Sequence, residues 1–250
     1  MVRRDAKVLG VVLVLVATGA VLYAKRVGSH HRAAAPPPLS ASLAQSGPWL
    51  RVPRAPGAVT LDGDTDDPGW VRPPGPAKTG DFLFEDGEQA RPYSQARLVW
   101  GDDYLYMALY ASDEDIESRV DRPDAPVGPD DDAIHILFSQ GDTEYAIDAS
   151  PNGMITDSIR HGAGGWDSTW NCGAHTSREL GGTVNAPNNL DEEWEIELAI
   201  PLSSLGLMGE PGESMGVSFR RCDTPKESPR VCAGWGEAAP GRGMGRMVLE

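Results

Sequence analysis

Two apolar runs on either side of a turn, within residues 97–110, constrain the fold of this chain most strongly. The runs are RLVW and YLYMALY, and the turn between them is Gly101-Asp102-Asp103. A period of two with many aromatic residues is typical of β-strands, and a Gly-Asp-Asp break is typical of a hairpin. The second strand is expected to separate its side chains onto two faces, with Leu105, Met107 and Leu109 on one and Tyr104, Tyr106 and Tyr110 on the other.

Short alternating runs of this kind continue to the end of the sequence. The 29 glycines and 21 prolines favour turns and short strands over long helices. We predict one helical turn at 202–205 and strands near 58–61, 95–100, 104–111, 133–139, 143–149, 174–179, 193–200, 214–221 and 244–249. This pattern predicts an all-β protein, an antiparallel β-sandwich of jelly-roll-like type.

The N-terminal part differs from the rest of the chain. Val8–Ala24 is 17 residues long and uncharged, with basic residues on both sides, which is typical of a signal sequence. Leu22 is a poor residue for a cleavage site after Ala24, so a retained membrane anchor is favoured over a cleaved signal peptide. We therefore expect an apolar helix at 1–27, a disordered Pro/Ala-rich linker at 28–57 and the folded domain at 58–250, in the cell envelope outside the cytoplasm, either anchored or secreted after cleavage.

The charge of the chain excludes one class of partner. The net charge is −15, although the first 32 residues are basic, so the remainder is strongly acidic. Nucleic-acid binding depends on clustered Lys and Arg, and we exclude it. An acidic surface suits cations or neutral ligands such as sugars.

The three cysteines fit an exported domain. Cys222 and Cys232 flank a polar loop with two prolines, and in a hairpin they could face each other and form a disulfide. Cys172 is then left over, either as a buried thiol or as an intermolecular partner.

Two groups of acidic residues could bind a cation. Asp62, Asp64 and Asp66 alternate as in a calcium loop, but Asp67 and Pro73 occupy the positions where an EF-hand needs Gly and Glu. A turn capped by Asp side chains is the favoured alternative there. A second group, residues 130–132, could hold calcium or sugar hydroxyl groups, or could form a solvated turn.

Trp166 and Trp170 lie in a glycine-rich segment and could stack on a sugar ring. Alternatively, one or both fold back to close an end of the sandwich. Residues 212–216 match G-x-S-x-G, but a strand is predicted after them and no histidine follows His175, so they are not a nucleophile elbow.

Taken in order, several segments resemble the family 9-like carbohydrate-binding modules of exported bacterial proteins. The segments are 61–63 with Asp66 and Trp70, 96–106, Asp132 with 134–138, Asn152-Gly153, 194–201 and 244–249. The resemblance implies a β-sandwich that binds sugars, often with calcium, and that commonly accompanies polysaccharide-degrading enzymes.

The sequence departs from the family pattern at the sugar site. Characterised members hold the sugar between two tryptophans, whereas residues 127–130 and 236–242 contain no aromatic residue here. His135 replaces a family glutamate, and Ala146 stands where an arginine is expected. Trp166, Trp170 and Trp235 would therefore be substitutes for the family tryptophans.

We predict a non-catalytic carbohydrate-binding module whose polar contacts come from Asp132, His135 and Asp148, with calcium as the one candidate cofactor. An alternative is a haem-binding electron-transfer sandwich with axial ligands among Met107, Met154 and His161, although the sequence has no C-x-x-C-H motif. Hydrolysis is disfavoured because no catalytic constellation is recognised. An envelope interaction domain with a degenerate sugar site is a further alternative.

Overall fold

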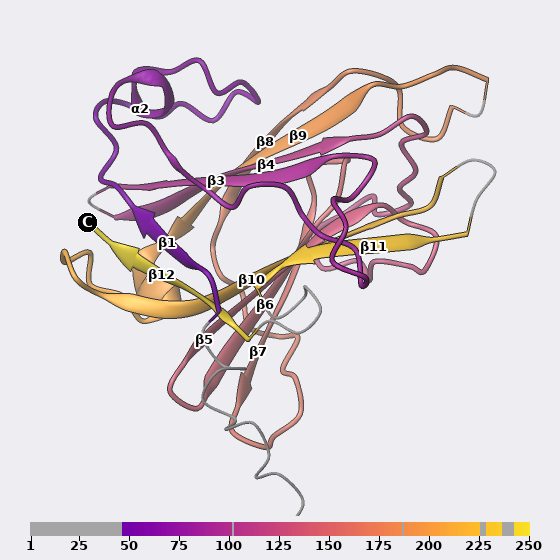
Figure 1. Ribbon diagram of the computed structural model, residues 1–250. Helices are drawn as coiled ribbons and strands as arrows, with labels where there is room; N and C mark the ends of the chain where they lie inside the picture. Colours follow the sequence, from indigo (N-terminus) through magenta and orange to yellow (C-terminus); the bar gives the residue numbers. More distant parts are fainter. Residues whose placement is uncertain (1–46, 102, 187, 226–228, 237–242) are drawn as a thin grey trace, which may run out of the picture. The chain divides into compact units, whose positions relative to one another are not determined.

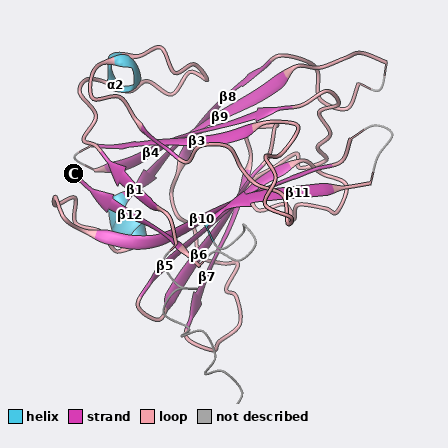
Figure 2. Ribbon diagram, in the orientation of Figure 1, coloured by secondary structure: helices cyan, strands magenta, loops and turns pink. Residues whose placement is uncertain are grey.

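A computed structural model describes residues 47–101, 103–186, 188–225, 229–236 and 243–250. Within these ranges the chain is built from strands, with one short helix, α2 (Pro68–Val71), and one 3-10 turn, η1 (Leu202–Leu205) (Figure 1, Figure 2). No helix in the described part has the length and apolar character to cross a bilayer. The apolar helix predicted at 1–27 lies outside the described residues.

The strands form two sheets. The first has seven strands, in the order β1-β12-β10-β5-β6-β7, and β11 also pairs with β10. Their bounds are β1 Trp49–Val52, β5 Ala133–Gln140, β6 Thr143–Ala149, β7 Ile155–His161, β10 Ser214–Asp223, β11 Val231–Trp235 and β12 Gly245–Leu249.

The second sheet has five strands, in the order β2-β3-β4-β9-β8. Their bounds are β2 Ala77–Lys78, β3 Ser94–Trp100, β4 Tyr104–Ser112, β8 His175–Leu180 and β9 Glu193–Pro201. The predicted hairpin is confirmed, since β3 and β4 pair antiparallel around Gly101.

The core lies between the two sheets. In β4 the alternation is as predicted, because Leu105, Met107 and Leu109 are fully buried while the tyrosines lie on the other face. On the seven-stranded sheet, Phe219 stacks against Phe82 at a ring-centroid distance of 6.2 Å and packs at a tilt against Trp235 at 6.0 Å. One apolar face of each sheet is thereby hidden, which confirms the predicted β-sandwich.

The boundaries of the domain differ from the prediction. Residues 49–52, assigned to the linker, form the edge strand β1, which pairs in parallel with β12, so the sandwich is not purely antiparallel. Residues 58–61 form no strand; they belong to a loop that returns over β9. Strands β2, β7 and β11 were not predicted, whereas the predicted helical turn at 202–205 is present.

The predicted disulfide between Cys222 and Cys232 is present. The two residues are direct cross-strand partners in β10 and β11, with a Cα–Cα distance of 4.2 Å. Cys172 is a fully buried free thiol, and burial raises its pKa to about 12. Of the two alternatives for Cys172, the structure favours the buried thiol.

A buried glutamate fastens the loop before α2 to the five-stranded sheet. Glu197 of β9 is fully buried and accepts hydrogen bonds from Trp70 Nε1 at 3.0 Å, from the Gly63 amide at 2.8 Å and from the Asp62 amide at 3.1 Å. Glu197 points away from the core as its place in the strand requires, but the loop covers it.

Replacing Glu197 with Ala should lower the free energy of unfolding by roughly 3 kcal/mol, because two buried donors and one partly buried donor lose their acceptor. Glu197→Gln keeps one oxygen acceptor and should lose roughly half as much. Urea denaturation of both variants measures the effect. Equal losses would show that the hydrogen bonds do not fasten the loop.

The neighbouring Glu195 predicts a pH dependence of stability. Burial raises its pKa to about 7, although Arg97 lies 3.8 Å away and acts in the opposite direction. Because the unfolded chain releases this proton at a lower pH, stability should fall as the pH rises towards 7. The melting temperature of Glu195→Gln, relative to that of the wild type, should therefore be higher at pH 8 than at pH 5. Glu179→Gln, at an exposed position, is the matched control. The prediction would be refuted if the melting temperatures of Glu195→Gln and the wild type differ by the same amount at both pH values.

Candidate functional site

The outer face of the seven-stranded sheet carries polar side chains in rows that cross the strands. His135 of β5 is the cross-strand partner of Arg220 in β10 on one side and of Asp148 in β6 on the other. Thr156 of β7 continues the row beyond Asp148. Because neighbouring positions in these strands point into the core, this row faces outward.

His135 and Asp148 form the central pair of the row. His135 Nδ1 lies 2.7 Å from Asp148 Oδ1, and the two side chains are 31% and 32% exposed. A carboxylate can only accept, so Nδ1 carries the proton and a neutral ring keeps Nε2 as an acceptor. The structure therefore brings together two predicted binding residues in a geometry that can bind hydroxyl groups.

Trp166 lies on the surface beside β7. Its side chain is 43% exposed, and the Arg160 guanidinium lies 4.7 Å from the centre of its ring. Arg160 is itself held by Glu144 of β6, at 2.6 Å between Nε and Oε2. The indole is thus positioned by a cation–π contact and an ion pair, with part of its surface open to solvent.

Two predicted binding residues occupy other places. Trp170 is partly buried and packs against Tyr145 at a ring distance of 5.4 Å, so it closes the sandwich, as the alternative prediction had it. Asp132 is fully buried, and its oxygens accept hydrogen bonds from the amides of Glu117 and Thr224. The prediction that Asp132 contacts a surface ligand is therefore wrong.

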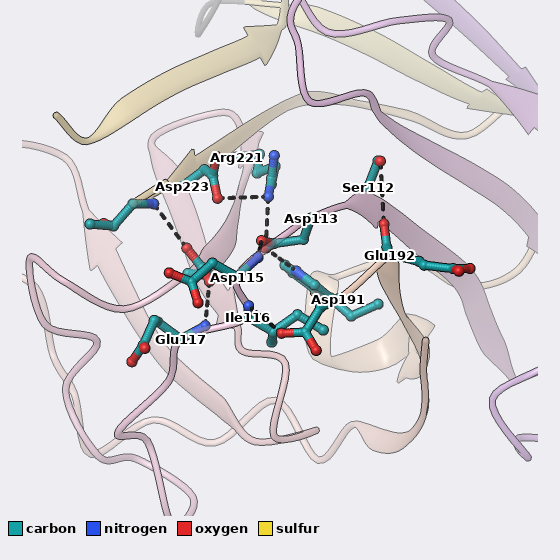
Figure 3. Close-up of polar contacts among 12 residues, drawn as sticks. Ser112, Asp113, Asp115, Ile116, Glu117, Asp191, Glu192, Arg221 and Asp223 are labelled. Atoms are coloured by element: carbon teal, nitrogen blue, oxygen red, sulfur yellow. Dashed lines mark hydrogen bonds and ion pairs between the residues drawn. The ribbon is translucent and has the colours of Figure 1, made fainter. Parts of the chain in front are cut away.

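Asp132 belongs instead to a buried acid cluster with Asp113 and Asp223. Figure 3 shows Asp113 and Asp223 joined through Arg221. One oxygen from each of the three carboxylates lies within 4.8 Å of the other two. Arg221 Nη2 donates to Asp113 Oδ2 at 2.8 Å and to Asp223 Oδ1 at 3.0 Å. All three acids are buried, with at most 2% of each residue exposed.

The charges of the acid cluster are not balanced by the protein groups within it. Full ionisation of the three carboxylates beside one guanidinium would leave a charge of about −2, so a carboxylate stays protonated at neutral pH unless a cation is bound. Burial raises the pKa of Asp132 to about 8 and that of Asp223 to about 6, and the charge of Asp113 adds to both shifts. Asp223 Oδ2 has no hydrogen-bond partner although it is buried. Carboxylate oxygens are the ligands that calcium prefers, so the residues present fit such an ion.

Asp62, Asp64 and Asp66, the predicted calcium ligands, are exposed. In the described part of the chain, the acid cluster is the single group of three carboxylates whose oxygens converge to this extent. Asp62 Oδ1 accepts a hydrogen bond from the Asp64 amide at 3.1 Å, which is the Asp-capped turn of the alternative prediction.

The residues named for haem binding are not brought together. Met107 is fully buried in the five-stranded sheet, whereas His161 is exposed at the end of β7 in the other sheet. Ser214 of the G-x-S-x-G match begins strand β10 and forms no strand-to-helix turn.

Sequence reasoning missed Arg220 and two members of the acid cluster, Asp113 and Asp223, although it named residues 130–132 as able to hold calcium. Apolar Val217 and Phe219 alternate with Ser218 and Arg220, and this pattern could have marked Arg220 as outward-facing. The members of the acid cluster come from three distant segments, and only the sheet topology brings them together.

Sequence comparison finds no relative: no family model and no curated protein matches this chain. Solved structures do match. A candidate carbohydrate-binding protein from Bacteroides uniformis is 14% identical, with 82% of this chain and all of that chain covered and a TM-score of 0.60. A family 9 carbohydrate-binding module from Caldicellulosiruptor kristjanssonii was solved with cellotriose and with glucose. Both structures are 17% identical with TM-scores of 0.52, covering 81% and 80% of this chain and 93% and 95% of theirs. The chain therefore has the fold of a family 9-like carbohydrate-binding module, as the ordered sequence segments predicted.

Proposed function

We propose that this protein is a non-catalytic carbohydrate-binding module that binds sugar on the outer face of its seven-stranded sheet. The observation that carries the proposal is the half-exposed His135–Asp148 pair in an outward-facing row with Arg220 and Thr156. Imidazole, carboxylate and guanidinium groups together offer the acceptors and donors that sugar hydroxyl groups need.

The likeness to modules solved with cellotriose and glucose supports glucose-containing ligands as the first to test. The Cys222–Cys232 disulfide supports a location outside the cytoplasm, since such bonds persist in oxidising compartments. The basic, apolar segment at residues 1–27 supports tethering of the module to the membrane.

His135→Ala should weaken binding of glucose and cellotriose about tenfold, because the ring loses its hydrogen bonds and the carboxylate of Asp148 loses its partner. Calorimetric titration of the full-length protein measures the dissociation constants. His175→Ala is the matched control, since His175 is exposed on β8 in the opposite sheet.

Unchanged affinity in His135→Ala would place the sugar elsewhere on the protein. If neither the wild type nor the variants bind any sugar of a broad panel, the proposed function is wrong. An envelope interaction domain would then be the better description.

We propose further that the acid cluster of Asp113, Asp132 and Asp223 holds a divalent cation such as calcium. The buried, unpartnered Asp223 Oδ2 and the excess of carboxyl groups over basic groups support this. The ion would neutralise the three carboxylates and join the end of β4 to those of β5 and β10, so its contribution would be to stability.

Addition of calcium should raise the melting temperature by an amount on the order of 5 °C, and chelation should reverse the rise. Asp223→Asn should abolish the response, because it removes the free carboxylate oxygen. Asp64→Asn, in the loop whose alternating aspartates resemble a calcium loop, should keep the response. If instead Asp64→Asn abolishes the response and Asp223→Asn keeps it, the cation binds in the Asp62–Asp66 loop. If calcium does not change the melting temperature of the wild type, the acid cluster binds no calcium.

A further inference from the structure

A second row on the outer face crosses the seven-stranded sheet from β1 to β7. Cross-strand pairing connects one residue of every strand along the sheet order. In order, the row contains Trp49, Arg246, Gly216, Ser139, Glu144 and Arg160.

Both ends of this row carry an exposed indole beside an arginine. The guanidinium of Arg246 lies 5.5 Å from the ring centre of Trp49, which is 60% exposed. At the other end Arg160 lies against Trp166 in the same way. A guanidinium covers one side of an indole ring and leaves the remainder for another flat partner.

The middle of the row is hollowed and polar. A pocket of about 460 Å³ is lined by Ser139, Gln140, Ser214, Gly216 and Arg246, among others. At Gly216 a side chain would not fit, since an added Cβ would lie 2.3 Å from Ser139 Oγ. The space above the glycine is taken by Ser139 Oγ and by Met244 Cγ, 2.9 Å from the same point, and these two side chains line the pocket.

We infer that this row, which we call the Trp49–Trp166 row, binds a linear oligosaccharide that lies across the strands. The indoles stack on the C–H faces of sugar rings at its two ends, and Ser139, Glu144 and the arginines bind hydroxyl groups between them. Strands are about 4.8 Å apart, close to the advance of an extended chain per sugar, so the row accommodates on the order of five sugar residues. The inference rests on the proposed function and extends it to the size of the ligand.

The twist of the sheet limits the physical form of the ligand. Adjacent strands are rotated by about 20–25°, so the two indoles cannot form one flat platform. A rigid, flat polysaccharide surface would contact only part of the row. A single soluble chain can follow the twist, and it is the ligand that the geometry favours.

The Trp49–Trp166 row is separate from the row of His135. His135 and Ser139 are four residues apart in β5, which corresponds to about 13 Å. A monosaccharide bound at His135 therefore reaches neither Trp49 nor Trp166, and the two rows can be tested independently.

Calorimetric titration of the full-length protein with glucose through cellohexaose tests the inference. Affinity should rise with chain length up to about five sugar residues. Trp49→Ala and Trp166→Ala should each weaken cellopentaose binding roughly three- to tenfold and leave glucose binding unchanged. Trp49→Phe and Trp166→Phe keep an aromatic ring and should retain most of the affinity, and melting curves verify that each variant is folded.

The outcomes separate the row from the proposed function. The inference about the Trp49–Trp166 row would be wrong if affinity stops rising at cellobiose, or if cellopentaose binding is unchanged in either Ala variant. Weaker glucose binding in His135→Ala would still support the proposed function in that case. Tighter retention on microcrystalline cellulose than on soluble chains would overturn the single-chain ligand. If the wild type binds no sugar of any length, the proposed function itself fails.

Discussion

Each of the two sheets has one apolar face that must be hidden from water, and the rest of the structure follows from this constraint. Strand side chains alternate, so burying Ile134 and Ile136 turns His135 outward. A slip of one residue in the pairing of β5 with β6 would send Asp148 into the core at a large cost in free energy. The core therefore determines the register, and the register places the polar groups of the outer face beside one another.

Carboxylates in this protein serve two different purposes, and burial separates them. Glu197 and Asp132 are fully buried and have backbone amides as donors, which offsets part of the cost of removing a carboxylate from water. Asp148 and Glu144 remain partly exposed on a sheet face, beside a histidine and an arginine. The second kind can exchange water for a ligand, whereas the first kind holds loops and strand ends in place.

The fold was predictable where local pattern and burial agree. Strands β4 and β9 alternate regularly and were predicted to within a few residues, and the cysteines flanking a polar loop do form a disulfide. Strand β7 was missed because Asp157 interrupts its apolar face. That carboxylate is buried to accept a hydrogen bond from the amide of Cys172, which the local sequence does not indicate.

The candidate site was less predictable, because it is assembled by pairing between distant strands. His135 and Asp148 were named from the sequence, but their direct contact depends on the β5–β6 register. Trp49 was assigned to a linker because prolines surround it, and only its pairing with Arg246 reveals it as part of the sheet face. Asp132 was misplaced because a run of aspartates does not show which of its members points inward.

The pairing of β1 with β12 has a consequence for how the chain reaches its native state. Residues 49–52 cannot complete their edge of the sheet until residues 246–249 are available, and almost the whole domain separates the two segments. Contacts between such remote segments form slowly, since the loop they close is long. During synthesis or export the apolar residues of β1 would stay unpaired until β12 has been synthesised or exported. Until β12 is available to pair with it, β1 is exposed to aggregation with other chains.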